Sequence, residues 1–133
     1  MKALIIIERG KDGTYSAYPA KLKTTIIGEG ETAEVAKADF LNSYEEIKQY
    51  YLETGEQMPA ELKDLEFEYK YDLAAFFSSF DFINVTKFAR VVGVEPSLMR
   101  HYKIGDAGIS MKQKRKIERG IHSLARELQN VTL

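Results

Sequence analysis

The most restrictive feature of this sequence is a strict alternation of apolar and charged residues near its middle. Five apolar residues alternate with four charged ones: Leu65, Phe67, Tyr69, Tyr71 and Leu73 with Glu66, Glu68, Lys70 and Asp72. A period of two places each set on its own face of a β-strand. The segment therefore predicts a half-buried strand, and the N-terminal half of the chain is expected to build a sheet.

Three shorter runs upstream are also typical of strands. Ala3–Ile7 is short and rich in Ile, and Tyr15–Tyr18 alternates aromatic and small residues after a turn at Lys11–Gly13. Thr24–Ile27 is a run of β-branched residues that predicts a third strand. We expect Gly28 and Gly30, which follow it, to end this strand. Together with the alternating segment, these runs predict a four-stranded sheet.

A single long helix is predicted between the third and fourth strands. Thr32 is suited to cap it, Glu34 favours its first turn, and Gly55 is placed to end it after Thr54. Its apolar residues recur at spacings of three and four: Ala33, Ala36, Phe40, Tyr44, Ile47 and Tyr51. The order β-β-β-α-β predicts a small α+β domain with one helix packed on the sheet. The fourth strand could cover the sheet edge or pair beside the first.

The segment Val85–Ile104 has the spacing of a helix-turn-helix. Ala89 supplies a small residue where two helices cross, Gly93 tolerates the turn between them, and Pro96 suits the first turn of the second helix. The apolar anchors that flank these positions are Phe88, Val92, Val94, Met99 and Tyr102. An αα-hairpin in a domain that binds no DNA could have the same pattern.

The second helix of this motif is predicted to present polar side chains to DNA. If Met99 and Tyr102 face inward, the outward-facing residues are Ser97, Arg100, His101 and Ile104. Arg and His side chains can donate hydrogen bonds to base edges or phosphates in a major groove. The complete set of expected DNA-binding residues is Lys87, Arg90, Ser97, Arg100, His101, Lys103, Lys112 and Arg115.

A final helix is predicted to begin after Ser110, with Gln113 completing a capping box. Its expected buried stripe is Ile117, Ile121, Leu124 and Leu128. Its first turns carry a basic cluster that could pair with phosphates, made of Lys112, Lys114, Arg115, Lys116 and Arg119.

These patterns divide the chain into two domains, residues 1–73 and 74–133, the second of them all-α. The aromatic stretch Phe76–Phe82 is expected to form a short helix and turn that fills the second core and joins the two halves. Residues 1–80 carry 9 Lys and Arg against 15 Asp and Glu (net −6), whereas residues 81–133 carry 10 against 5 (net +5). A basic half joined to an acidic half favours two surfaces with different partners.

Composition excludes several classes of function. The chain has no cysteine, so disulfides, thiolate metal sites and cysteine nucleophiles are excluded. No apolar run approaches the roughly 20 residues of a membrane span, and we expect a cytoplasmic protein. His101 and His122 are far apart in the sequence, and no other plausible metal ligands accompany them. They therefore do not predict a metal site. We expect no cofactor.

No catalytic motif is present, and we expect no enzymatic activity. Carboxylates are plentiful in the N-terminal half, and a two-metal nuclease would need several of them to converge. Glu8, at the end of the first strand, is the best-placed single candidate. The others lie in a turn, on a helix, in a loop and on the polar face of a strand, as expected for surface charges.

The two halves together resemble HicB-type antitoxins. The matching residues are the strand Leu4–Glu8, the turn at Asp12 and Gly13, the strand Tyr15–Tyr18, and the helix entry Gly30–Glu34. The resemblance implies a partial ribonuclease-H-like domain without nuclease activity, joined to a lambda-repressor-like helix-turn-helix. Relatives carry a Pro-x-Leu-Pro-Gly-Cys stretch after the second strand, where this chain has Pro19–Thr25.

The resemblance implies an antitoxin that neutralises a small basic, mRNA-cleaving HicA-type toxin and represses its own operon by binding operator DNA. Two alternatives stay open: an orphan regulator whose N-terminal domain oligomerises or senses a ligand, and a weak metal-dependent nuclease. Operators are usually read by two-fold pairs about 34 Å apart. We therefore expect a homodimer or a higher even oligomer, joined through the sheet edge or the final helix.

Overall fold

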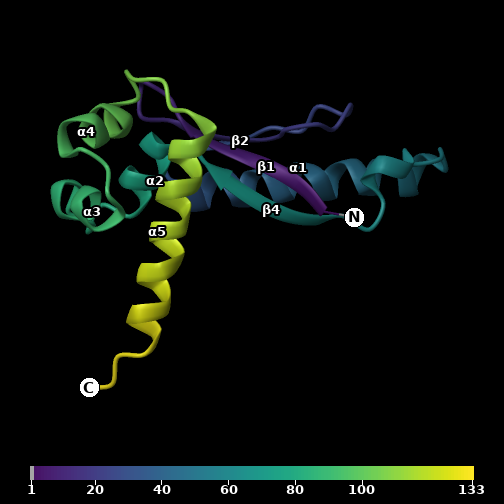
Figure 1. Ribbon diagram of the computed structural model, residues 1–133. Helices are drawn as coiled ribbons and strands as arrows, with labels where there is room; N and C mark the ends of the chain where they lie inside the picture. The colour runs from purple at the N-terminus through teal and green to yellow at the C-terminus, as the bar shows by residue number, and fades with distance from the viewer. Residues whose placement is uncertain (1) are drawn as a thin grey trace. The chain divides into compact units, whose positions relative to one another are not determined.

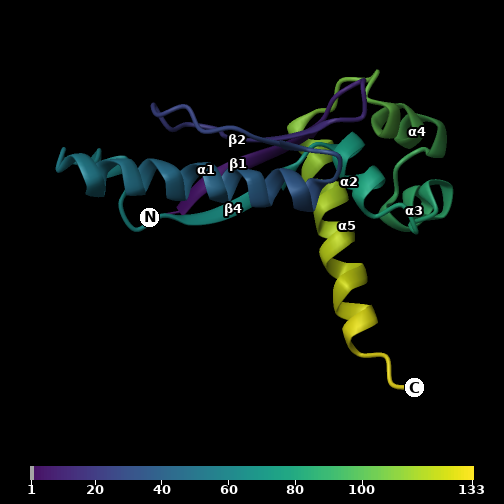
Figure 2. The same ribbon diagram turned by 180° about the vertical axis from the view of Figure 1, so that it is seen from behind.

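The computed structural model describes residues 2–133 and divides the chain into two compact units, which meet in sequence between Ser79 and Phe80 (Figures 1 and 2). The first unit is α+β and the second is all-α. In the first unit the elements are β1 (Lys2–Arg9), β2 (Tyr15–Pro19), β3 (Gly28–Gly30), α1 (Ala33–Thr54), a 3-10 turn (Ala60–Leu62), β4 (Glu66–Tyr71) and α2 (Leu73–Ser79). In the second they are α3 (Val85–Val92), α4 (Pro96–Ile104) and α5 (Met111–Gln129).

The four strands form one mixed sheet in the order β3-β2-β1-β4. β2 pairs antiparallel with both β1 and β3, whereas β4 runs parallel to β1, with Ile5 opposite Tyr69. The predicted order β-β-β-α-β is therefore confirmed. The fourth strand pairs beside the first, which resolves the choice that the sequence left open.

The core of the first unit lies between the sheet and α1. Alternate residues of β1, such as Ile5 and Ile7, are fully buried there. Phe40 and Tyr44 of α1 each meet the ring of Phe67 edge to face, with centroids 5.2 Å apart. The predicted alternation of β4 thus places its aromatic residues against the helix and its charged residues on the other face.

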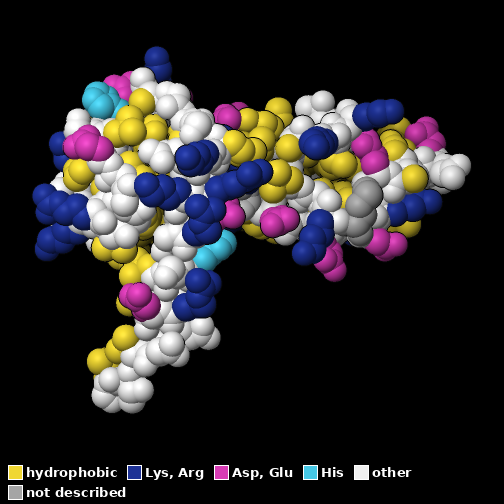
Figure 3. Space-filling model, viewed as in Figure 1, with side chains coloured by type: hydrophobic (Ala, Val, Ile, Leu, Met, Phe, Trp, Pro, Cys, Tyr) yellow, Lys and Arg dark blue, Asp and Glu magenta, His cyan; other side chains and the backbone are white. Residues whose placement is uncertain are grey.

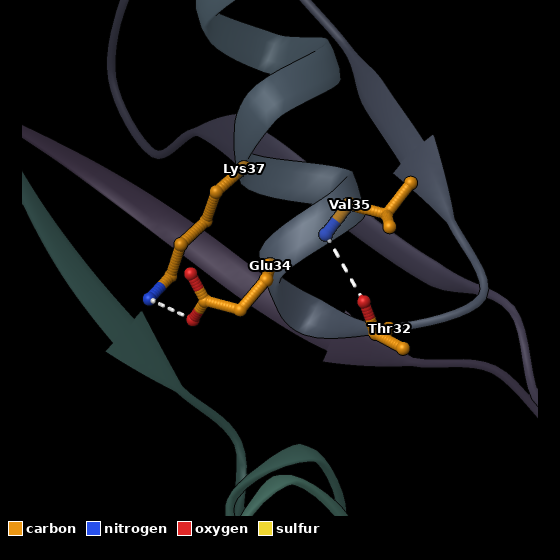
Figure 4. A network of polar contacts seen from close by, with 4 residues as sticks. All are labelled: Thr32, Glu34, Val35 and Lys37. Carbon is orange, nitrogen blue, oxygen red and sulfur yellow. Dashed lines mark hydrogen bonds and ion pairs between the residues drawn. The ribbon is translucent and has the colours of Figure 1, made fainter.

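α1 begins as predicted. The Thr32 hydroxyl accepts a hydrogen bond from the Val35 amide (3.1 Å), which caps the helix (Figure 4). Lys37 pairs with Glu34 one turn earlier (3.4 Å) and lies over the rings of two β4 tyrosines. Gly55 ends the helix in the left-handed conformation.

The predicted third strand at Thr24–Ile27 is wrong, because β3 lies at Gly28–Gly30. The backbone amides of Lys23 and Thr24 donate to the Glu61 carboxylate, so they do not join the sheet. Gly28 is part of the strand because β3 lies directly on α1, where a side chain would strike the helix backbone. The glycines that we expected to close the strand are the residues that form it.

α2 belongs to the first unit. It packs against β1 and β4, and its Ala75 is part of the sheet–helix core. The Asp72 carboxylate accepts the Ala75 amide (2.7 Å) and caps the helix. The predicted short helix is present as α2, and the division between the two units falls within the aromatic stretch, as expected for the joint between the halves. The division between units falls after Ser79, where we had expected it after Leu73.

The three helices of the second unit begin close to the predicted positions. The side chains of Asn84, Glu95 and Ser110 cap α3, α4 and α5 in turn, each by accepting an amide three residues later. The predicted stripe on α5 is only partly buried. Ile117 is buried, Ile121 and Leu124 are half-buried, and Leu128 is exposed. Within residues 2–133, no helix combines the length and apolar character of a membrane span.

We expect Ala89→Leu to destabilise the second unit. Ala89 is fully buried on α3, a helix that packs against both α4 and α5. Added methyl groups in a filled core cost about 1–3 kcal/mol. The measurement is thermal unfolding, with Val91→Leu as the control because Val91 lies on the same helix but is exposed. If both variants melt like the wild type, Ala89 is not at a tight helix crossing.

Candidate nucleic-acid interface

A tight turn at Gly93 joins α3 to α4. Gly93 adopts a left-handed conformation (φ 79°, ψ 32°) that favours glycine, and the Val94 amide donates to the Ala89 carbonyl. Pro96 occupies the first turn of α4, where its missing amide hydrogen costs nothing. The turn predicted from Gly93 and Pro96 is confirmed.

α4 presents a buried face and a polar face. Met99 and Tyr102 are buried, as predicted. Ser97, Arg100 and His101 are exposed, together with Ile104, which adds an apolar contact surface. An α-helix with short polar and basic side chains on one face can enter a major groove and reach base edges.

Two contacts orient the basic residues of α4. The Arg100 guanidinium donates to the Thr86 hydroxyl of α3 (3.3 Å). His101 Nδ1 lies 2.9 Å from the Asp106 carboxylate, which follows the helix in the next loop. Sequence reasoning missed both partners, since neither contact follows a helical spacing. Asp106 holds the imidazole so that Nε2 points away from the carboxylate.

The other predicted basic residues lie on α3, on α4 and at the start of α5. Lys87 lies in the first turn of α3 and Arg90 in its last turn, and both are exposed. Lys103 of α4 and the pair Lys112 and Arg115 of α5 are exposed as well. Dark blue Lys and Arg side chains gather on this unit in Figure 3. All eight predicted DNA-binding residues thus lie on the surface of the helical unit.

One member of the basic cluster has a structural role. The Lys116 ammonium donates to the Gly93 carbonyl at 2.6 Å. This bond ties the start of α5 to the turn between α3 and α4. It also satisfies a carbonyl at the end of α3, which has no partner within the helix. Lys116 is therefore less free to meet a phosphate than its neighbours Lys112 and Arg115.

The carboxylates of the first unit mostly have local partners. Glu8 accepts the Tyr18 hydroxyl (2.5 Å); this hydrogen bond first, and burial second, raise the pKa of Tyr18 to about 12. Asp39 accepts the Glu29 amide (2.9 Å). Asp72 caps α2, and its burial raises the pKa of that carboxyl, with Glu8 adding a smaller repulsion.

The proximity of Glu8 and Asp72 was not predicted, although they follow paired positions on parallel strands. Across residues 2–133, no cluster of three His, Cys, Asp or Glu side chains could hold a metal ion. The arrangement around Glu8 is a hydrogen-bonded pair with Tyr18 beside the Asp72 helix cap.

Comparison of the chain with protein-family models, with curated proteins and with solved structures gave no match.

Proposed function

We propose that this protein is a DNA-binding transcription regulator whose second unit reads an operator. The observation that carries the proposal is the α3–α4 turn at Gly93, together with a polar, basic face on α4. The charge balance of the two halves agrees with this assignment, because residues 81–133 carry 10 Lys and Arg against 5 Asp and Glu. A polyanion is the partner that such a surface favours.

The proposed contacts divide by element. α4 enters the major groove, and Ser97, Arg100 and His101 reach base edges from its exposed face. The other five predicted residues meet the phosphate backbone and position the helix: Lys87, Arg90, Lys103, Lys112 and Arg115.

The experiment is a salt titration of the full chain on the DNA upstream of its own gene and on random DNA of equal length. We expect tighter binding to the upstream DNA, by about 10³-fold or more, and a steep fall in both affinities as salt rises. Equal affinity for the two DNAs would contradict operator recognition. Failure to bind either would contradict the proposal as a whole.

We further propose that the first unit is the partial ribonuclease-H-like domain of an antitoxin, as the resemblance to HicB-type antitoxins implies. The order β-β-β-α-β supports this. So does the sheet face opposite the buried residues of β1, where Leu4 is 37% exposed and lies beside Glu68. Other carboxylates on that face are Glu8, Glu29 and Glu66. Lys2 and Lys70 lie on the same face, so its four carboxylates leave a net charge of −2. A negative face with an apolar centre suits a small basic toxin.

The test is coexpression with the product of a neighbouring gene, if that gene encodes a short basic protein. An antitoxin should restore growth, form a stable complex and, with the toxin, occupy its own operator. Operator binding without any such neighbour or complex would favour the alternative, an orphan regulator whose N-terminal domain serves oligomerisation or ligand sensing.

A further inference from the structure

His101 and Asp106 form a side-chain pair at the end of α4. Nδ1 of the imidazole lies 2.9 Å from an oxygen of the Asp106 carboxylate. The two side chains are 54% and 52% exposed, so the contact lies at the surface of the helical unit. Asp106 has no part in the base contacts proposed above, although its partner His101 does.

The backbone at the end of α4 fixes Asp106 beside His101. Gly105 ends the helix in the left-handed conformation (φ 86°), which turns the chain back over its last turn. The carbonyl of His101 accepts the amides of both Gly105 (2.9 Å) and Asp106 (3.2 Å). Asp106 is therefore joined to His101 twice, once through its backbone amide and once through its carboxylate.

The chemistry of the pair decides which ring nitrogen carries the proton. An ionised carboxylate only accepts hydrogen bonds, so Nδ1, which faces it, must be the protonated nitrogen. In a neutral imidazole with a proton on Nδ1, Nε2 has a lone pair and can only accept. Carboxylates that orient histidines in metal sites and catalytic triads select the tautomer in this way.

We propose that Asp106 makes His101 a hydrogen-bond acceptor in the major groove, and that His101 reads an exocyclic amino group there. This inference rests on the proposed function. The amino groups exposed in that groove are N6 of adenine and N4 of cytosine, whereas guanine and thymine present acceptors and, on thymine, a methyl group. On the strand that it contacts, His101 therefore favours adenine or cytosine over guanine or thymine. Asp106 is a positioning residue, because it acts on the DNA through His101.

An acceptor at His101 complements the donor beside it. The guanidinium of Arg100 has only donors, which suit the acceptors of guanine. Both side chains are exposed on α4. One donor and one acceptor on the same helix can read a pattern of base edges that two cations cannot distinguish.

The first experiment determines the tautomer by nitrogen-15 NMR of the imidazole rings, in the full chain without DNA at about pH 8, where imidazoles are ordinarily neutral. We expect His101 to be protonated on Nδ1 alone. Asp106→Asn should give a mixture of tautomers, because an amide can both donate and accept. His122, the other histidine, is exposed on α5 and is the internal reference, which should not change between the two proteins. A proton on Nε2 of His101 in the wild type would overturn the inference.

The second experiment uses base analogues in the DNA upstream of the protein's own gene, at the same pH. Purine replaces one adenine at a time and 2-pyrimidinone replaces one cytosine at a time, and each analogue lacks only the amino group. We expect one position at which the wild type loses affinity by about fivefold, the worth of one hydrogen bond. His101→Ala should be insensitive to the analogue at that position, which corrects for any weakening of the base pair itself. The analogue that takes effect identifies the base.

A donating imidazole would give a different result. Its contact would be lost on 7-deazaguanine or 7-deazaadenine, which lack the N7 acceptor, and not on the analogues that lack an amino group. Such a pattern, dependent on His101, would overturn the inference.

Asp106→Asn should lose the discrimination at the identified position, although His101 is intact. It should also bind random DNA about twofold more tightly, because a negative charge is removed from a surface that meets phosphates. A residue with only a structural role would weaken both DNAs when it is replaced. Asp81→Asn is the matched control, since Asp81 is an exposed residue of the same unit and undergoes the same chemical change. It should keep the wild-type discrimination, and an Asp106→Asn protein that also keeps it would refute the positioning role.

Failure of this inference is distinguishable from failure of the proposed function. Operator binding with no amino group whose effect depends on His101 would refute the inference and leave the regulator standing. Absence of binding to any DNA would refute the regulator and, with it, the reading of a base by His101, while the tautomer determined by NMR would stand.

Discussion

Gly28→Ala should unfold the first unit at a much lower temperature than the wild type. A Cβ atom at Gly28 would lie 2.3 Å from both the Ala36 carbonyl oxygen and the Phe40 amide nitrogen. Both are backbone atoms of α1, so no side-chain rotation can relieve the overlap, and the helix or β3 must move. We expect a cost of about 3 kcal/mol, at the upper end for overpacking, and a melting temperature lower by roughly 15 °C.

Gly108→Ala is the matched control for this variant. Nothing lies within 4 Å of a Cβ atom at Gly108, so the same chemical change should leave unfolding almost unaltered. Calorimetry is the suitable measurement, since it can follow the two units as separate transitions. A Gly28→Ala protein that melts like the Gly108→Ala protein would show that β3 does not lie directly on α1.

Arg100→Ala and Arg115→Ala should weaken DNA binding in different ways. Arg100 projects from the face of α4 proposed to enter the groove, so its loss should cost about 1–3 kcal/mol on the operator and much less on random DNA. Arg115 is proposed to meet a phosphate. Its loss should weaken both DNAs about equally and reduce the salt dependence by about one unit of slope.

Salt titrations of both variants on both DNAs measure the difference. Thr86→Val is the matched control for Arg100, because it removes only the hydroxyl that accepts the guanidinium hydrogen bond. It should reduce operator affinity by less than Arg100→Ala does. Equal losses on operator and random DNA for Arg100→Ala would contradict the assignment of α4 as the recognition helix.

Local chemistry explains which parts of the fold could be predicted. The side chains of Thr32, Asn84 and Ser110 each accept a hydrogen bond from the amide three residues later. The residues that start a helix therefore lie within one helical turn of each other in the sequence. The alternation around Phe67 and Tyr69 is equally local. For the same reason the buried positions of Met99 and Tyr102 on α4 followed from helical spacing.

The features that sequence reasoning missed depend on residues far apart in the chain. Thr24 is not part of the sheet, because its backbone amide donates instead to the carboxylate of Glu61, 37 residues later. Gly28 forms strand rather than ending one because α1 lies against it. The stripe on α5 had the spacing of a buried face, but spacing does not say whether the covering surface comes from the same chain. Leu128 illustrates that ambiguity: it was correctly predicted to lie in the last helix, but the prediction that it is buried was wrong.

The parallel pairing of β1 with β4 has a consequence for how the protein is made. Of the four strands, β1 is synthesised first. Its partner β4 is separated from it by β2, β3 and the 22 residues of α1. The first unit can therefore close its sheet only after Tyr71 has been synthesised. The second unit relies on helices that are neighbours in sequence, and short loops of this kind close quickly. The portion translated last is thus expected to reach its native form with little delay, while the portion translated first waits for its final strand.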